Sequence, residues 1–215
     1  MSKIIQFLLI ACLFQAQLLP LQNKKRILFF GDSLTAGYGI SQKQAFPHLV
    51  KQKIDSLNLP FSVVNGGLSG ETSSGGLRRI DWLLKQQTDI LVLELGGNDA
   101  LRGLDLNLTQ NNLQAIINKA RTKYPNIEII LAGMQAPPNL GSKYVDQFKA
   151  IYPHLAKENK TALIPFLLAG VGGIPQLNLP DGIHPTVKGH KIVAEIVWKT
   201  LRPILLKTIK QEAPR

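Results

Sequence analysis

Two spacings of apolar residues alternate along the chain from residue 24 onward. Short, nearly continuous apolar runs have the pattern of buried strands at 26–30, 61–64, 89–95, 127–132 and 162–166. Between them, apolar residues recur every three or four positions, as on one face of a helix, at 44–57, 77–84, 113–120, 143–157 and 187–206. This alternation predicts an α/β fold, a three-layer sandwich in which helices cover both faces of a five-stranded parallel sheet.

The segments after the third predicted strand carry turn and loop signals. Residues Gly96 to Asp99, Gly-Gly-Asn-Asp, predict a sharp turn, and residues 101–108 are expected to be a loop. Asp105, Asn107 and Thr109 are candidate N-caps for the helix that follows, because short polar side chains satisfy free N–H groups at helix starts.

The end of the chain and its two tryptophans lead to three smaller predictions. The charged residues from Lys207 onward are expected to fray from the last helix. Trp82 and Trp198 lie in helical segments and are expected to anchor them in the core. Because neither an internal repeat nor an interdomain linker divides the sequence, residues 23–215 are expected to form one domain.

Polar clusters follow the predicted strands. They are Asp32-Ser33, the loop from Gly66 to Glu71, Gly97-Asn98-Asp99, the loop from Gln135 to Asn139 and, after a longer loop, Asp181-Gly182-Ile183-His184-Pro185. Right-handed crossovers bring the carboxyl ends of all parallel strands to one edge of the sheet. Ligands bind at that edge in open α/β sheets, so we expect these clusters to form one site.

Composition narrows the choice of partner. The chain is 45% hydrophobic and 18% charged, as in ordinary globular proteins, but its formal net charge is +11. Such a charge could attract nucleic acid, yet the basic residues are scattered, and aromatic residues do not interleave with them. We therefore predict a solvated basic surface and no nucleic-acid partner.

The first 22 residues have the pattern of an export signal. Lys3 provides a short positive start, and Ile4 to Phe14 is an apolar run too short to span a membrane. The run contains Leu9-Ile10-Ala11-Cys12, which is similar to a bacterial lipobox, so Cys12 is either a lipid anchor or incidental. Cys12 is the only cysteine, which rules out an intramolecular disulfide. The pattern predicts an exported, periplasmic protein, either free or associated with the membrane.

The side chains at the predicted edge match the parts needed for acyl transfer. A serine such as Ser33 is a weak nucleophile and needs a base, usually a histidine held by a carboxylate. Asp181 and His184 are close in sequence around a glycine, so both side chains could face the same way in a tight turn. The backbone N–H of Gly70 and the amide of Asn98 are suitable donors to the oxyanion that forms during the reaction.

Four blocks in this order resemble the GDSL/SGNH hydrolase family, over residues 26 to about 206: Gly31-Asp32-Ser33-Leu34, Leu68-Ser69-Gly70-Glu71-Thr72, Gly96-Gly97-Asn98-Asp99 and Asp181-Gly182-Ile183-His184-Pro185. Within that family, the chain most resembles the periplasmic thioesterase I/lysophospholipase L1/arylesterase group through Thr35-Ala36-Gly37-Tyr38, Glu94 to Asp99 and Leu101-Arg102-Gly103. The first block ends in Thr35 rather than serine, which is a change between similar hydroxyl residues.

The resemblance implies a flavodoxin-like fold and a role for each block residue. It implies that Ser33 is the nucleophile, His184 the general base and Asp181 the acid that orients it. It implies three oxyanion donors, which are the backbone N–H groups of Ser33 and Gly70 and the side-chain amide of Asn98. The implied activity is cleavage of carboxylic esters or thioesters through an acyl-enzyme, without a metal or an organic cofactor.

The same residues also fit other interpretations. Gly31-Asp32-Ser33 alone also fits a turn and helix N-cap. An α/β-hydrolase would need a glycine where Thr35 stands, and a metallophosphoesterase would need histidines beside its metal blocks. A carbohydrate O-acetyl esterase of the same fold and, more remotely, a non-catalytic basic envelope-binding module remain alternatives.

The acyl pocket is predicted in the loops 101–108, 135–144 and 167–179, which follow the third, fourth and fifth strands. Their apolar residues are Leu101, Leu104, Leu106, Leu108, Pro137, Leu140, Leu167 and Ile174. Among them Leu101, Leu104 and Pro137, together with Asp32, are the candidate substrate-binding residues. Lysophospholipid, acyl thioester, aryl ester and acetylated sugar all fit this prediction, and the protein is expected to act as a monomer.

Overall fold

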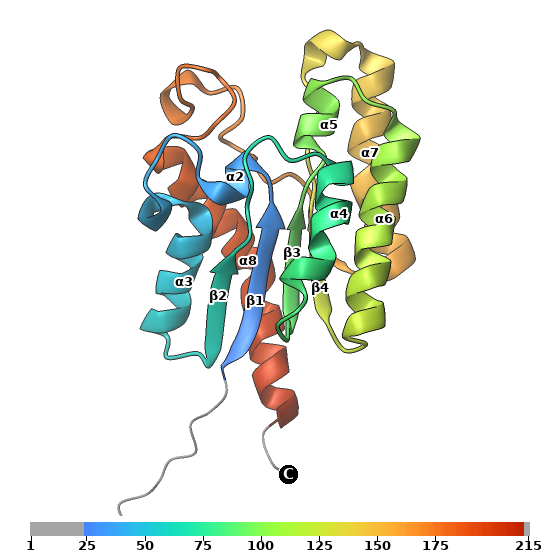
Figure 1. Ribbon diagram of the computed structural model, residues 1–215. Helices are drawn as coiled ribbons and strands as arrows, with labels where there is room; N and C mark the ends of the chain where they lie inside the picture. The colour runs from blue at the N-terminus through green and yellow to red at the C-terminus, as the bar shows by residue number, and fades with distance from the viewer. Residues whose placement is uncertain (1–23, 213–215) are drawn as a thin grey trace, which may run out of the picture.

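The computed structural model describes residues 24–212, which form a three-layer α/β sandwich (Figure 1). Five parallel strands form one sheet in the order β2-β1-β3-β4-β5. The strands are β1 (Lys25–Gly31), β2 (Phe61–Asn65), β3 (Ile90–Glu94), β4 (Glu128–Ala132) and β5 (Ala162–Ile164). The predicted fold class is confirmed, and each predicted strand is present.

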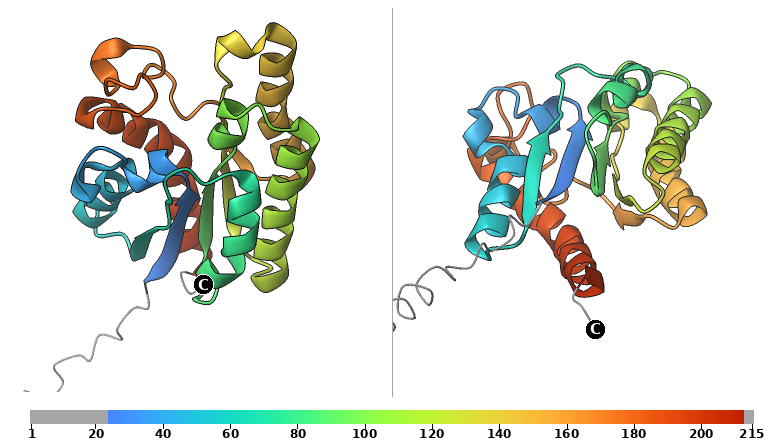
Figure 2. Two further views of the ribbon diagram at one scale, coloured as in Figure 1. Left: turned by 45° about the horizontal axis from the view of Figure 1, so that its top comes forward. Right: turned by 60° about the horizontal axis from the view of Figure 1, so that its bottom comes forward.

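Helices cover both faces of the sheet, as Figures 1 and 2 show. α3 (Phe46–Ser56) packs beside α8 (Val187–Glu212) on one face. α4 (Ser73–Leu83), α6 (Leu106–Lys123) and α7 (Ser142–Asn159) lie side by side on the other. Short helical turns complete the chain: α2 (Ser33–Ala36), α5 (Gly97–Leu101) and the 3-10 turns η1 (Gln42–Gln44), η2 (Pro138–Leu140) and η3 (Pro175–Leu177).

The chain leaves β1 toward β2 on one side and later returns to place β3 on the other side of β1. The carboxyl ends of β1 and β3 therefore flank the point at which the strand order reverses, where ligands bind in such sheets. Both strands are buried on both faces, and their side chains form the centre of the core: Ile27, Leu28, Phe29, Phe30, Ile90, Leu91, Val92 and Leu93. This burial explains why they read as continuous apolar runs rather than alternating ones.

Three local predictions were wrong or incomplete at element ends. Residues 101–108 are not one loop, because α5 extends to Leu101 and α6 begins at Leu106. Asp105 is the N-cap of α6 and accepts the Leu108 N–H at 2.8 Å, whereas Asn107 and Thr109 lie inside the helix. β5 ends at Ile164 rather than Phe166, because Pro165 has no N–H to donate to the sheet.

The two tryptophans and the end of α8 also differ from expectation. α8 continues to Glu212 instead of fraying at Lys207, whose ammonium group lies 3.0 Å from a Glu128 carboxylate oxygen. Trp82 is 65% exposed, because Ile80 and Leu83 take the inward face of α4. Trp198 does pack against the core, as predicted.

The described helices include none that is both long enough and apolar enough to span a membrane. The predicted export signal, residues 1–22 with Cys12, lies outside the described residues. Its prediction therefore rests on the sequence pattern alone.

A buried histidine joins the two helices that cover one face of the sheet. His190 of α8 is 1% exposed, and its Nδ1 accepts the N–H of Phe46, the first residue of α3, at 3.2 Å. Its ring stacks on that of Phe46. The imidazole must be neutral to accept this bond, and burial, aided by the charge of His184, lowers the pKa of His190 from 6.5 to about 4.

This shift predicts a loss of stability in acid. Between pH 6.5 and 4 the unfolded chain binds a proton at His190 that the folded chain does not, so the contribution of His190 is complete above pH 6.5 and declines below it. From pH 7 to 4.5 the wild type should lose about 2 to 3 kcal/mol more unfolding free energy than His190→Gln. Urea titrations at both pH values measure this difference, and equal losses in the two proteins would contradict it.

Candidate active site

The turn that carries Ser33 is built by the end of β1 and the start of α2. Asp32 is the N-cap of α2, and its Oδ1 accepts the Leu34 N–H at 2.9 Å. A side chain could not replace Gly31, because a Cβ there would lie 2.2 Å from Thr35 Oγ1 and 2.3 Å from Glu94 Oε2. The turn-and-cap interpretation of Asp32 is thus correct, and it holds Ser33 at the edge of the sheet.

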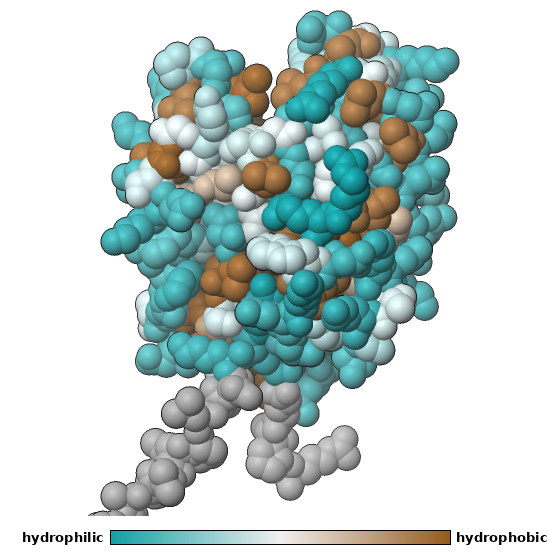
Figure 3. Space-filling view, in the orientation of Figure 1, coloured by the Kyte–Doolittle hydropathy of each residue, from teal (hydrophilic) through white to brown (hydrophobic). Residues whose placement is uncertain are grey.

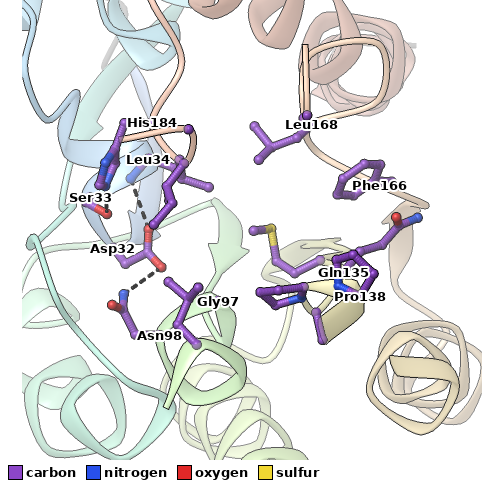
Figure 4. A pocket seen from close by; sticks show the side chains of 18 residues that line it. Asp32, Ser33, Leu34, Gly97, Asn98, Gln135, Pro138, Phe166, Leu168 and His184 are labelled. Carbon is purple, nitrogen blue, oxygen red and sulfur yellow. Dashed lines mark hydrogen bonds between the residues drawn. The ribbon is translucent and has the colours of Figure 1, made fainter. Parts of the chain in front are cut away.

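Ser33, His184 and Asp181 form a continuous chain of contacts. His184 Nε2 lies 2.9 Å from Ser33 Oγ, and His184 Nδ1 lies 2.7 Å from Asp181 Oδ2 (Figure 4 shows the Ser33–His184 contact). The other carboxylate oxygen of Asp181 accepts the backbone N–H groups of Ile183 and His184 at 2.9 and 3.0 Å. One carboxylate therefore fixes both the tight turn and the orientation of the imidazole.

The same contacts keep Asp181 ionised. Burial alone would raise the pKa of this carboxyl, but the hydrogen bonds from the backbone N–H and ring of His184 and from Ile183 N–H outweigh it and lower the pKa to about 2. An ionised Asp181 favours the tautomer that carries its proton on Nδ1 and leaves Nε2 free to accept the proton of Ser33.

Tyr38 lies against the histidine, with ring centroids 4.5 Å apart. Its ring is half exposed and covers one side of the imidazole. In the sequence, Tyr38 stood out only as part of a motif, without an expected role. An aromatic residue shortly after the serine turn was its only local signal, and the pairing with His184 depends on the tertiary fold.

Asn98 lies near the serine turn, with both hydrogens of its amide engaged. Its Nδ2 donates to Asp32 Oδ2 at 3.0 Å and to the Glu71 carbonyl at 3.1 Å (Figure 4 shows the first bond). Binding an oxyanion would therefore require one of these acceptors to be replaced. Both carboxylate oxygens of Asp32 have protein donors, so Asp32 positions Leu34 and Asn98 while it also lines the cavity next to Ser33.

Gly70 lies in the loop after β2, next to Glu71, whose carbonyl binds Asn98. Its φ of +78° is favoured by glycine, and its carbonyl accepts an N–H from Arg102 at 3.1 Å. The structure thus brings Ser33, Asp181, His184 and Asn98 together directly, and it links Gly70 to them through Glu71.

A buried carboxyl group, that of Glu94, supports the serine turn, although no role was predicted for it from the sequence. Glu94, at the end of β3, is 1% exposed, and its Oε2 accepts the Asp32 N–H at 3.1 Å and the Thr35 hydroxyl at 2.7 Å. Burial raises the pKa of Asp32 to about 6 and that of Glu94 well above its usual range. An acid inside an apolar strand was the available signal for Glu94.

A cavity of about 450 Å³ begins at Ser33 and His184 and extends between the loops that follow β3, β4 and β5 (Figure 4). Most of its lining is apolar: Leu34, Leu101, Met134, Ala136, Pro137, Pro138, Phe166 and Leu168. Leu101 and Pro137 line it, as the sequence analysis expected. Leu104 does not line this cavity, and its carbonyl instead accepts the Tyr144 hydroxyl at 2.9 Å.

The other apolar residues of the predicted rim lie elsewhere. Leu106, Leu108, Leu140 and Ile174 do not line this cavity, and Leu167 is fully buried in the core. Met134, Phe166 and Leu168 take their place, and Phe166 was expected to belong to a strand. Within residues 24–212, no three His, Cys, Asp or Glu side chains are grouped so that they could hold a metal ion.

Comparison with known families agrees with this geometry. The model of the GDSL-like Lipase/Acylhydrolase family matches residues 29–192, a range that begins in β1 and ends in α8 and so includes the turns of Ser33, Asn98 and His184 and the loop of Gly70. The chain belongs to this family. The family predicted from the four sequence blocks is thereby confirmed, and this GDSL-like acylhydrolase is a serine ester hydrolase.

Relatives similar along most of their length support the same conclusion. The acylhydrolase is 39% identical to Esterase TesA of Pseudomonas aeruginosa over 199 residues, covering 92% of this chain and 98% of the relative. It is 41% identical to Thioesterase 1/protease 1/lysophospholipase L1 of Escherichia coli K12, covering 83% and 84%. A crystal structure of TesA has a TM-score of 0.80 at 39% identity, covering 83% of this chain and 99% of that one.

Proposed function

We propose that this acylhydrolase cleaves acyl esters and thioesters through an acyl-enzyme on Ser33. His184 is the general base, Asp181 orients it, and the N–H groups of Ser33 and Gly70 and the amide of Asn98 bind the oxyanion. The observation that carries the proposal is the set of contacts from Asp181 through His184 to Ser33, at 2.7 and 2.9 Å, at the mouth of an apolar cavity.

The proposed reaction has two halves. Ser33 Oγ attacks the carbonyl carbon while its proton passes to His184 Nε2, and the carbonyl oxygen becomes the oxyanion. Collapse breaks the bond to the alcohol or thiol, which leaves with the proton from His184. Water then attacks the acyl-enzyme with His184 again as base, and the released acid restores the Ser33 hydroxyl.

The cavity supports an acyl chain as the part of the substrate that lies beyond Ser33. Its volume of about 450 Å³ and its apolar lining suit a chain of several methylene groups, each of which contributes about 0.8 kcal/mol when fully buried. Relatives named as a thioesterase and a lysophospholipase agree with an acyl substrate. An acetyl group would leave most of this apolar surface uncovered. We therefore rank a carbohydrate O-acetyl esterase second, after an enzyme for longer acyl chains.

A chain-length series tests this choice. With p-nitrophenyl esters, kcat/KM should rise about tenfold or more from acetyl to octanoyl, because each added methylene buries apolar surface. Leu168→Trp should fill the cavity and reduce the octanoyl value more than the acetyl value. Ile174→Trp, outside this cavity, is the matched control and should leave the ratio unchanged. A wild type that prefers acetyl would favour the second candidate.

We also propose that the enzyme is exported to the periplasm. The support is the short positive start and apolar run of residues 1–22. Osmotic-shock fractionation should release the activity from cells, and retention with the membrane that Cys12→Ser abolishes would identify a lipid anchor. Activity that stays in the cytosolic fraction would contradict export.

A further inference from the structure

A second cavity, of about 460 Å³, adjoins the site on the side of Gly70. It is lined by Leu68, Ser69, Gly70, Glu71, Thr72, Gly75, Arg78, Arg79 and Arg102. It shares no lining residue with the apolar cavity, and Asn98 lies between the two. Asn98 lines the apolar cavity, and its amide donates to the carbonyl of Glu71, which lines the second. We call this second hollow the arginine cavity.

Only one of the three arginines is neutralised by a carboxylate. Arg79 donates from Nε to Glu71 Oε1 at 2.8 Å and from Nη2 to Glu71 Oε2 and the Gly66 carbonyl. Its guanidinium also lies 5.0 Å from the centre of the Phe30 ring. These contacts make Arg79 a structural residue that holds the loop around Gly70 to α4.

The other two arginines carry uncompensated charge into the arginine cavity. Arg102 is exposed, and the only hydrogen bond that its side chain makes among residues 24–212 is the one that it donates to the Gly70 carbonyl. Arg78 is also exposed, and its guanidinium group has neither a hydrogen bond nor an ion pair within the described part of the chain. Figure 3 shows strongly hydrophilic side chains gathered on this face, over α4 and α5, beside apolar ones.

Two guanidinium groups that no carboxylate neutralises within the described residues, next to Gly70, suit a phosphate. The guanidinium group is planar, always charged and matched to the spacing of phosphate oxygens. The exposed Ser69 hydroxyl lines the same cavity and could donate one more bond. Asn98 lines the apolar cavity and bonds to Glu71 of this hollow, so a substrate with its acyl chain in the apolar cavity and its carbonyl at Ser33 could place its alcohol or thiol part here.

We propose that the arginine cavity binds a phosphate group of the leaving alcohol or thiol, and so selects phosphorylated esters and thioesters over neutral ones. The proposal rests on the proposed acyl-enzyme function at Ser33. The phosphate could belong to a lysophospholipid headgroup or to a nucleotide-bearing thiol such as coenzyme A. Binding it would use a part of the substrate that does not react to raise kcat/KM.

Charge reversal at Arg78 tests the proposal without touching the catalytic groups. For Arg78→Glu, kcat/KM for octanoyl-CoA should fall at least tenfold, mainly through KM, while that for p-nitrophenyl octanoate stays within twofold. Added salt should reduce the wild-type preference for the CoA ester, because the attraction is screened. Lys85→Glu makes the same change of charge at an exposed position outside the arginine cavity, and should have less than a threefold effect on both substrates.

A second substrate pair separates the two sources of phosphate. Octanoyl lysophosphatidylglycerol and monooctanoylglycerol differ by the phosphate-bearing headgroup. If Arg78→Glu lowers kcat/KM for the lysolipid relative to monooctanoylglycerol but leaves octanoyl-CoA unaffected, the lipid headgroup is the ligand. If it lowers kcat/KM only for octanoyl-CoA, the nucleotide-bearing thiol is the ligand. Equal losses for charged and neutral esters, no loss for either, or the same loss in Lys85→Glu would overturn the proposal.

A binding measurement separates this proposal from the proposed reaction. Calorimetry of Ser33→Ala with coenzyme A should show binding at least tenfold tighter than that of Ser33→Ala/Arg78→Glu. Inorganic phosphate should compete for the same site. If this difference appears while the wild type hydrolyses no ester, the arginine cavity stands and the acyl-enzyme proposal fails. If hydrolysis occurs and neither coenzyme A nor inorganic phosphate binds more weakly to the double variant, the arginine cavity is wrong and the reaction stands.

Discussion

Replacing Ser33 with alanine should lower kcat/KM for p-nitrophenyl octanoate by about 10⁴-fold or more, with the fold intact. Ser33 Oγ lies 2.9 Å from His184 Nε2, at the mouth of the apolar cavity, and no other side chain in this site is placed to act as the nucleophile. Alanine is a good helix former and keeps the backbone N–H that we assign to the oxyanion. The variant should therefore still bind acyl ligands, which separates an enzyme from a non-catalytic binding module.

The activity assay needs a control for the effect of losing any hydroxyl. Ser56→Ala removes an exposed hydroxyl at the end of α3 that bonds only to its own helix, and it should keep full activity. Thermal unfolding should give Ser33→Ala a midpoint close to that of the wild type. A Ser33→Ala protein that retains more than a tenth of wild-type activity after correction for contaminating esterases would exclude Ser33 as nucleophile.

The second large effect is expected for Asp181→Asn, at about 10³ to 10⁴-fold in kcat. Asparagine can still accept the N–H groups of Ile183 and His184 through its carbonyl oxygen, so the turn should survive. Its NH₂ group would then face His184 Nδ1, 2.7 Å away in the wild type, and donate to it. That tautomer carries its proton on Nε2 and cannot accept the proton of Ser33.

The pH dependence of the wild type should contain no step from Asp181. The pKa of Asp181 is about 2, so its carboxylate stays ionised throughout the range in which the enzyme is folded and assayed. Activity lost on acidification from pH 8 to 5 should therefore not come from protonation of Asp181, whereas Asp32, whose pKa burial raises to about 6, gains a proton in this range. Asp105→Asn, at an N-cap far from the serine, is the matched control and should retain full activity. Unchanged kcat in Asp181→Asn would remove Asp181 from the mechanism.

Much of the fold could be predicted because the sequence signals were local. The apolar runs at β1 and β3 are continuous because both faces of these strands are covered, and helical spacing marked each long helix. The polar residues after each strand could be assigned to one edge because parallel strands share their direction. The blocks around Ser33, Asn98 and His184 then predicted a family that the comparison confirmed.

The errors concern positions where tertiary contacts decide. α8 continues through Lys207 because Ile209, one turn from its end, packs against the core, and Lys207 also lies 3.0 Å from Glu128 on a distant strand. Trp82 is exposed because Ile80 and Leu83 already occupy the inward face of α4. The local pattern contains neither the position of β4 nor the choice between neighbouring apolar residues on a helix.

Within the site, the residues that support the reacting groups were the hardest to predict. Glu94 appeared only as an interruption of an apolar strand, yet it holds both Asp32 and Thr35. Tyr38 covers the imidazole from a turn that is far from His184 in sequence. The cavity uses Phe166 and Leu168 in place of Leu104, because η2 and the loop after β5 fold over the end of the sheet in a way that loop composition does not encode.

Covalent labelling tests the central claim most directly. A fluorophosphonate forms a stable bond only with a serine whose proton is accepted by a neighbouring base, so it reports the nucleophile itself. Intact mass spectrometry of the wild type should show one adduct per chain, which peptide mapping should assign to Ser33. The adduct should be absent in Ser33→Ala and slow to form in Asp181→Asn. Ester hydrolysis without any adduct, or an adduct on another residue, would contradict the assignment of Ser33 as the nucleophile.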